Sequence, residues 1–85
     1  MSKKEKRLAK LRSNPKNIRF DELVAVLQDF GFESVHVVGS HHKFRVEIGE
    51  KVYQVEIVYR TPHVKKGYVT LVLETIDTIL KDKEE

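Results

Sequence analysis

Two stretches of alternating residues flank Gly49-Glu50, and their pairing constrains the fold more than any other feature of the chain. Glycine at the first central position is what a two-residue type II′ hairpin turn requires. The turn would pair a strand from about His41 to Ile48 with a strand from Lys51 to about Tyr59. One face would pair Ile48 with Lys51, Val46 with Tyr53, Phe44 with Val55 and His42 with Ile57; the other would pair Arg45 with Gln54, Lys43 with Glu56 and His41 with Val58. We therefore expect one apolar face and one polar face with a complementary charge pair.

Two helical patterns and a further strand pattern surround this hairpin. Residues 20–30 carry apolar side chains at the spacing of an amphipathic helix, and Gly31 follows as a left-handed C-cap. Residues 34–38 are rich in β-branched side chains, which is typical of a strand. Residues 60–67 form a loop dense in cations, and residues 68–80 return to helical spacing.

The order of these elements predicts an α+β domain. We expect α-β-β-β-α, with a three-stranded antiparallel sheet and two helices on one face, which is the layout of double-stranded-RNA-binding domains. A chain of 85 residues is long enough for one such core and too short for two. We therefore divide the chain into a basic leader over residues 1–16 and one domain over residues 17–85.

Positive charge is concentrated in the leader. Residues 1–19 hold eight of the 16 Lys and Arg residues but a single acidic residue, Glu5, so the net charge of +3 hides a strong asymmetry. The total charge is therefore a weak argument for nucleic-acid binding. Any such argument must rest on where the cations lie locally. Residues 3–12 could form a short helix that ends before Pro15 and binds RNA phosphates or a protein partner. The alternative is a solvated tail. The sequence leaves both open.

The composition limits the cellular compartments and the kinds of metal or disulfide site that are expected. The chain has no cysteine, so neither a disulfide nor a thiolate metal site is expected, and a reducing cytoplasmic compartment is favoured. The charged start lacks the apolar run of a secretory signal, and no stretch is long enough to span a membrane. Neighbouring strand residues point apart, so His41 and His42 are not expected to chelate one ion. We expect no metal, no cofactor and no membrane contact.

Two histidines follow Gly39-Ser40 at the start of the second strand. Alternation places His41 on the same face as Lys43 and Arg45, whereas His42 shares a face with core residues. His41 is therefore the candidate catalytic residue. The expected phosphate-binding residues are Ser40, Lys43, Arg45, Lys65 and Lys66, with His42 and His63 as auxiliary candidates. His36 is expected to be structural.

These residues also resemble a known family. Phe20-Asp21-Glu22-Leu23, Phe30-Gly31-Phe32, Gly39-Ser40-His41-His42-Lys43-Phe44-Arg45, a loop with His63 and a closing helix resemble the HicA (YcfA-like) toxins of HicAB toxin–antitoxin systems. Residues 13–20 are similar to the leading segment of a longer-leader subgroup. The resemblance covers roughly residues 13–80. It implies a ribosome-independent mRNA interferase whose catalytic histidine directly follows Gly-Ser, here His41, and a HicB-like antitoxin as partner.

RNA cleavage needs little from a protein of this size, because RNA carries its own nucleophile in the 2′-OH. One histidine can serve in both proton-transfer roles, and nearby cations can stabilise the phosphate. We expect a metal-independent endoribonuclease that leaves a cyclic phosphate and does not cut DNA. A non-catalytic RNA-binding module and a protein-interaction module are the alternatives. A homodimer and a hetero-oligomer with the antitoxin are both open.

Overall fold

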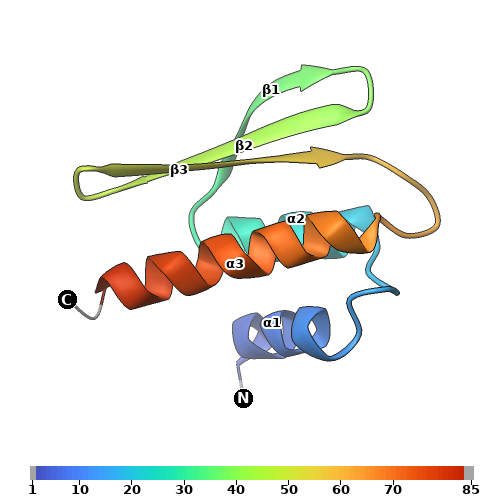
Figure 1. Ribbon diagram of the computed structural model, residues 1–85, viewed down its shortest axis with the longest axis horizontal. Helices are drawn as coiled ribbons and strands as arrows, with labels where there is room; N and C mark the ends of the chain where they lie inside the picture. The colour runs from blue at the N-terminus through green and yellow to red at the C-terminus, as the bar shows by residue number, and fades with distance from the viewer. Residues whose placement is uncertain (1, 84–85) are drawn as a thin grey trace.

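The computed structural model describes residues 2–83 and has three layers. Its elements are α1 (Lys3–Ser13), α2 (Phe20–Asp29), β1 (Glu33–Val38), β2 (His41–Ile48), β3 (Lys51–Val58) and α3 (Lys66–Lys83). The antiparallel sheet has the strand order β1-β2-β3. Helices α2 and α3 cover one face of this sheet, and α1 lies beyond them on the side away from the strands (Figure 1). The α+β class with one three-stranded antiparallel sheet is therefore confirmed.

The β2–β3 hairpin has the register that alternation predicts. Every expected pair is present, from Ile48 opposite Lys51 at the turn to His41 opposite Val58 at the far end. Gly49 has φ +63°, and no residue other than glycine has a positive φ in the described part of the chain. A positive φ at the first central residue alone is the type II′ pattern. The expected turn is thus confirmed.

Strand β1 pairs with β2 less regularly. The register shifts between Ser34 and His36, which leaves Val35 as an extra residue in a β-bulge. All six residues of β1 are exposed, and Val35 keeps 50% of its surface accessible. The strand expected at residues 34–38 is present, but it forms an open edge of the sheet.

Helix α2 ends in the cap that its sequence predicts. The N–H of Phe32 donates to the Leu27 carbonyl at 3.0 Å, and the N–H of Gly31 donates to the Gln28 carbonyl at 3.0 Å. Gly31 has φ +89°. These two bonds form a Schellman motif, in which glycine adopts the left-handed conformation that other residues rarely adopt. The motif buries Phe32 beneath the sheet and starts the chain toward β1.

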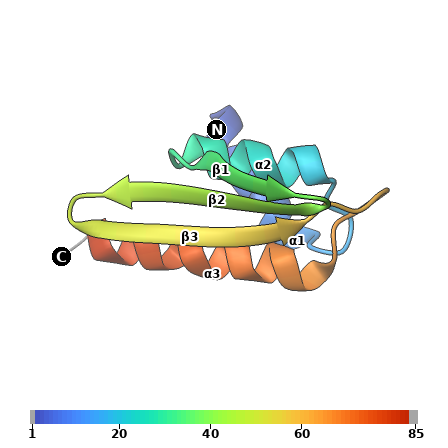
Figure 2. The ribbon, with the colours of Figure 1, turned by 90° about the horizontal axis from the view of Figure 1, so that it is seen from above.

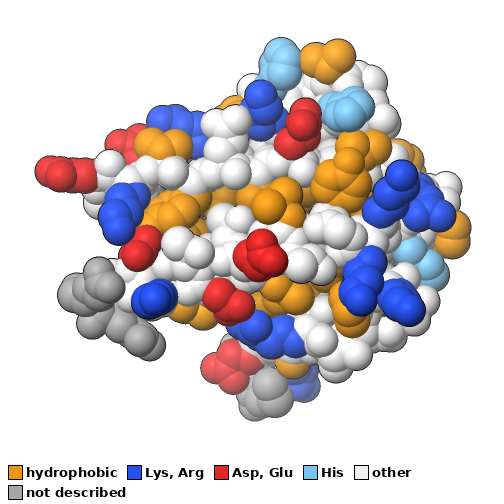
Figure 3. Space-filling model, in the orientation of Figure 1, with side chains coloured by type: hydrophobic (Ala, Val, Ile, Leu, Met, Phe, Trp, Pro, Cys, Tyr) orange, Lys and Arg blue, Asp and Glu red, His pale blue; other side chains and the backbone are white. Residues whose placement is uncertain are grey.

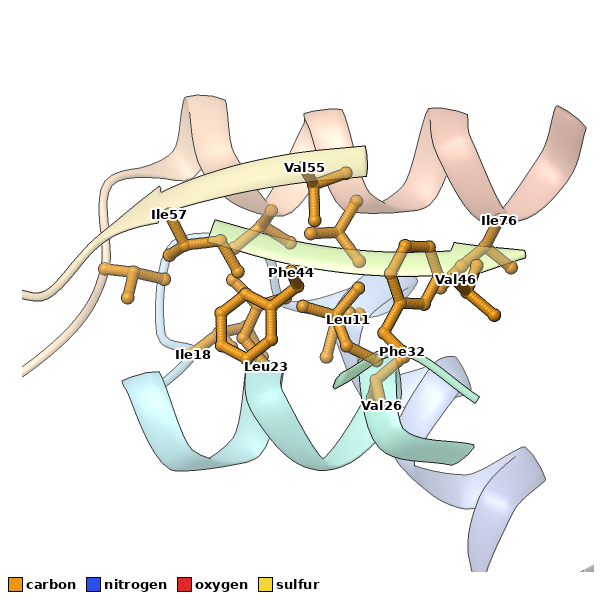
Figure 4. Packing of buried hydrophobic residues seen from close by; sticks show 14 of the residues in the cluster. Leu11, Ile18, Leu23, Val26, Phe32, Phe44, Val46, Val55, Ile57 and Ile76 are labelled. Atoms are coloured by element: carbon orange, nitrogen blue, oxygen red, sulfur yellow. The ribbon is translucent and has the colours of Figure 1, made fainter. Parts of the chain in front are cut away.

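Most of the core lies between the sheet and the α2–α3 layer (Figure 4), and Leu11 of α1 joins it from the helix side. Its buried side chains are Leu11, Ile18, Leu23, Val26, Leu27, Phe32, Phe44, Val46, Val55, Ile57, Val64, Val69, Val72, Ile76 and Ile79. The residues that β2 and β3 contribute are the alternate apolar ones of the hairpin, as predicted. No polar or charged residue is buried among residues 2–83. The core therefore depends on apolar burial alone.

Helix α1 is part of the packed structure, so the solvated-tail alternative for the leader is wrong. Leu11 is only 1% exposed. The Arg7 guanidinium holds Asp29 at 2.7 and 2.6 Å, and Lys10 pairs with Glu22. The hydrogen bond from Arg7 holds the pKa of the Asp29 carboxyl below its usual value.

A third ion pair joins α1 to the closing helix. Arg12 Nη2 lies 2.6 Å from Asp77, and this hydrogen bond lowers the pKa of the Asp77 carboxyl. Three cations of the leader therefore hold α1 against α2 and α3.

Helix α3 starts at Lys66, two residues earlier than its apolar spacing predicts, so the preceding loop is shorter than expected.

Candidate functional site

The uncovered face of the sheet carries most of the predicted site residues. All three helices lie on the other side of the strands, as Figures 1 and 2 show from two directions. We use "uncovered face" for this side of the sheet, whose charged and histidine residues are His36 of β1, His41, Lys43, Arg45 and Glu47 of β2, and Glu56 of β3. This polar surface is continuous across the three strands. It can take an extended ligand without any movement of the helices.

His41 lies on this face, as alternation predicts. Its side chain is 57% exposed, and its Nδ1 lies 3.6 Å from Oε1 of Glu56. It follows the Gly39-Ser40 turn, where φ is +58° at Gly39. A carboxylate beside one ring nitrogen leaves the other nitrogen free for proton transfer. His41 is therefore placed to act as a general base or acid.

The partner of Glu56 differs from the expected one. The register places Glu56 directly opposite Lys43, and we expected a charge pair between them. Among residues 2–83 the basic side chain that contacts Glu56, at 3.6 Å, is instead that of His41, its diagonal neighbour on the same face. Diagonal neighbours come within reach of long side chains on a twisted sheet. The expectation was therefore right in register and wrong in pairing.

The two cations of the uncovered face differ in availability. Arg45 Nη2 lies 3.7 Å from Oε2 of Glu47, so its charge is partly balanced along the same strand. Lys43 is half-buried and has no ion pair within the described residues. Ser40 is exposed, and its carbonyl accepts a 2.7 Å hydrogen bond from the Tyr59 N–H. Lys43 is thus the cation near His41 that is free to bind a phosphate.

His36 is a second histidine on this face, where we expected a structural residue. It lies opposite Lys43 in the β1–β2 register and is exposed. Its position is diagonal to His41, within reach of long side chains on the same face. Sequence reasoning missed His36 because the β1 register depends on the bulge. It placed Glu56 on the correct face but missed the contact of Glu56 with His41.

His42 points to the helix side, away from the uncovered face. Its ring lies 4.7 Å from the Phe20 ring and 6.5 Å from the Tyr59 ring, and Phe20 and Tyr59 are 5.1 Å apart. His42 thus lies on the same face as the core residues, as alternation predicts, and packs against aromatic rings there. His42 does not join His41 in one constellation.

The loop cations lie in a separate hollow. Lys65, Lys66 and His63 line it together with Lys16 and Arg60. The loop is tied to the segment before α2 by a 3.0 Å hydrogen bond from the Val64 N–H to the Ile18 carbonyl. The site predicted as one group is therefore divided in two by the structure.

Three further observations bear on function. Among residues 2–83, no group of three or more His, Cys, Asp or Glu residues could hold a metal ion. Within the same residues no helix is long and apolar enough to cross a membrane. Comparisons of the chain with family models, with curated proteins and with solved structures found no match.

Proposed function

We propose that this chain is an endoribonuclease that cuts mRNA, the toxin of a toxin–antitoxin pair, as its resemblance to the HicA toxins implies. The observation that carries the proposal is the exposed imidazole of His41, paired with Glu56 at 3.6 Å on an open, polar sheet face. The resemblance implies catalysis by the same residue. The sequence pattern and the geometry thus both favour the imidazole of His41 as the catalytic group.

The proposed reaction uses the 2′-OH of the substrate as nucleophile. His41 takes the proton of this hydroxyl as its oxygen attacks phosphorus. The bond from phosphorus to the 5′-oxygen breaks, and a proton returned by an imidazole completes the leaving hydroxyl. The products are a 2′,3′-cyclic phosphate and a 5′-hydroxyl end. Lys43 offsets charge on the phosphate oxygens, and His36 is a second proton donor on the same face.

The finer fold assignment belongs to the same proposal. The order α2-β1-β2-β3-α3 agrees with a double-stranded-RNA-binding layout, to which α1 is added. Fold alone does not assign an activity, so the proposal depends on the site. We place the protein in the cytoplasm, where its mRNA substrate is.

A HicB-like antitoxin is the proposed protein partner, and the uncovered face is its proposed docking surface. Val38 and Val52 are 59% and 50% exposed and lie on this face beside the polar residues. Apolar side chains beside ionised ones are typical of a protein interface. The same valines favour the alternative that the chain is a non-catalytic interaction module.

One comparison tests the proposal. Purified protein and a His41→Ala variant, prepared in the same way, are incubated with end-labelled RNA in EDTA, beside DNA of the same sequence. We expect the wild type to cut RNA only and the variant to cut neither. Equal cutting by both proteins would indicate a contaminating nuclease and overturn the assignment of His41. Binding by both without cutting would support an RNA-binding module, and neither binding nor cutting would support the interaction module.

A further inference from the structure

A cationic hollow lies at one end of the molecule, between the segment before α2 and the loop before α3. We call it the basic hollow. Its lining residues are Lys16, Arg60, Pro62, His63, Val64, Lys65 and Lys66. Four of these seven side chains are cations and none is acidic. Figure 3 shows Lys and Arg side chains gathered at this end, around a histidine.

The charge of the basic hollow is not neutralised within the protein. No ion pair among residues 2–83 involves the four cations of the hollow, whereas Arg7, Lys10 and Arg12 of α1 each have an acidic partner. All four are exposed. Other cations also lack an ion pair among the described residues, but the basic hollow gathers four of them around one concave surface. Free, clustered cations are what a polyanion requires.

The backbone around the basic hollow is held in place. Val64 is 2% exposed, and its N–H donates to the Ile18 carbonyl at 3.0 Å. Helix α3 begins at Lys66, so the positive end of its dipole adds to the field of the side chains. A fixed loop presents the cations to a ligand at little ordering cost.

An aromatic platform adjoins the basic hollow. A neighbouring hollow is lined by Phe20 and Tyr59 and shares Arg60 and Pro62 with the first. Tyr59 is 48% exposed and is supported edge-on by Phe20 at 5.1 Å. Asp21 also lines this neighbouring hollow, where it is balanced by Arg19 at 3.5 Å. An exposed aromatic ring beside a cationic groove is how proteins bind unpaired nucleotides, because bases stack on the ring while phosphates contact the cations.

A backbone hydrogen bond holds the platform close to the residue before the catalytic candidate. The Tyr59 N–H donates to the carbonyl of Ser40, the residue before His41, at 2.7 Å. We infer that the basic hollow and Tyr59 bind single-stranded RNA next to the cleavage point. Its phosphates contact Lys16, Arg60, Lys65 and Lys66, one base stacks on Tyr59, and the strand continues past the end of the sheet to His41. This inference rests on the proposed function, since it assigns the site for the flanking nucleotides of the same substrate.

Binding without cleavage tests the inference. A short single-stranded RNA with every 2′-OH methylated has no nucleophile, so fluorescence anisotropy on it reports binding alone. The Lys16→Ala/Lys65→Ala variant should bind about tenfold more weakly or worse, with a shallower salt dependence by about 0.7 for each phosphate contact removed. The matched control is Lys51→Ala/Lys81→Ala, which removes the same charge elsewhere and should bind within about twofold of wild type. Tyr59→Ala should weaken binding about fivefold or more.

The outcomes separate the inference from the proposed function. Equal binding by the hollow and control variants would overturn the inference, as would tighter binding of a methylated duplex than of the single strand. Ordinary RNA cut by the hollow variant at the wild-type rate under subsaturating conditions would also overturn it, and would leave the nuclease proposal standing. Binding through the hollow by a wild type that cuts no RNA would support the hollow as an RNA-binding site, and would overturn the nuclease together with the placement next to a cleavage point. Thermal melting checks that each variant is folded.

Discussion

The two faces of the sheet differ in what they contribute. On the covered face, Phe44, Val55 and Ile57 are almost fully buried against the helices. On the uncovered face, the side chains of His41 and Glu56 are each more than half exposed. The same two strands supply both faces, because successive side chains point in opposite directions. Alternate residues of one hairpin thus stabilise the fold or carry the proposed catalysis. A substitution on one face should change stability without changing catalysis, and one on the other face should do the reverse.

The largest effect should come from His41→Ala. Loss of the proton-transfer group should lower the rate of RNA cleavage by about 10²–10⁴-fold. The urea midpoint of unfolding should stay close to wild type, since the side chain is 57% exposed. Cleavage rates and denaturation curves on the same samples test both parts. A large loss of stability would show that the two faces are not independent.

Leu11→Ala tests the opposite side of the comparison. This side chain is 1% exposed, so its truncation should cost about 2–5 kcal/mol of unfolding free energy. Cleavage by the folded fraction should be unchanged, because α1 lies on the side of the helices away from the sheet. Urea denaturation measures the unfolding free energy. Cleavage assays well below the melting temperature measure the rate of the folded protein. A cost under about 0.5 kcal/mol, the size of an ordinary surface change, would mean that α1 is not docked as described.

Glu56→Gln should have a smaller effect on cleavage. An exposed ion pair is worth about 0.2–1 kcal/mol, so losing the contact at 3.6 Å should slow cleavage by up to about fivefold. Gln54→Ala, on the same strand and face, is the matched control and should be nearly silent. A fall as large as that of His41→Ala would make Glu56 a proton-transfer group in its own right.

The smallest effect concerns stability at acid pH. The pKa of Asp29 is held low by Arg7, and a carboxyl with a lowered folded pKa stabilises the fold above its unfolded value, about 3.9. This contribution should be lost as pH falls from about 5 through the folded pKa. Asp29→Asn removes the titrating group, so its urea midpoint should fall less over this range than that of wild type. Identical pH dependence in both proteins would contradict the role of this ion pair.

The parts of the fold that could be predicted depend on short-range patterns. Alternation around Gly49-Glu50 predicts the hairpin register, and Gly31 after an amphipathic run predicts the cap of α2. Both signals lie within about ten residues of their effect. They also place His41 and His42 on opposite faces, because strand alternation is a local property.

The parts that could not be predicted depend on contacts between distant segments. Arg7 and Asp29 are 22 residues apart, and nothing in either neighbourhood announces their pairing. Lys16 joins Lys65 and Lys66 only because the loop before α3 is bonded to the segment before α2. His36 reaches the uncovered face through a register shift. Each of these depends on tertiary geometry, which residue spacing does not encode.

The bulge at Val35 has a consequence for self-association. A regular edge strand offers a continuous row of N–H and C=O groups to a strand of another molecule, which is how many sheet proteins aggregate. In β1 the shift between Ser34 and His36 interrupts that row, and the local twist turns the edge away from a flat partner. Removing Val35 would restore an unbroken template beside exposed valines. The extra residue therefore makes the β1 edge a poorer template for pairing with another molecule.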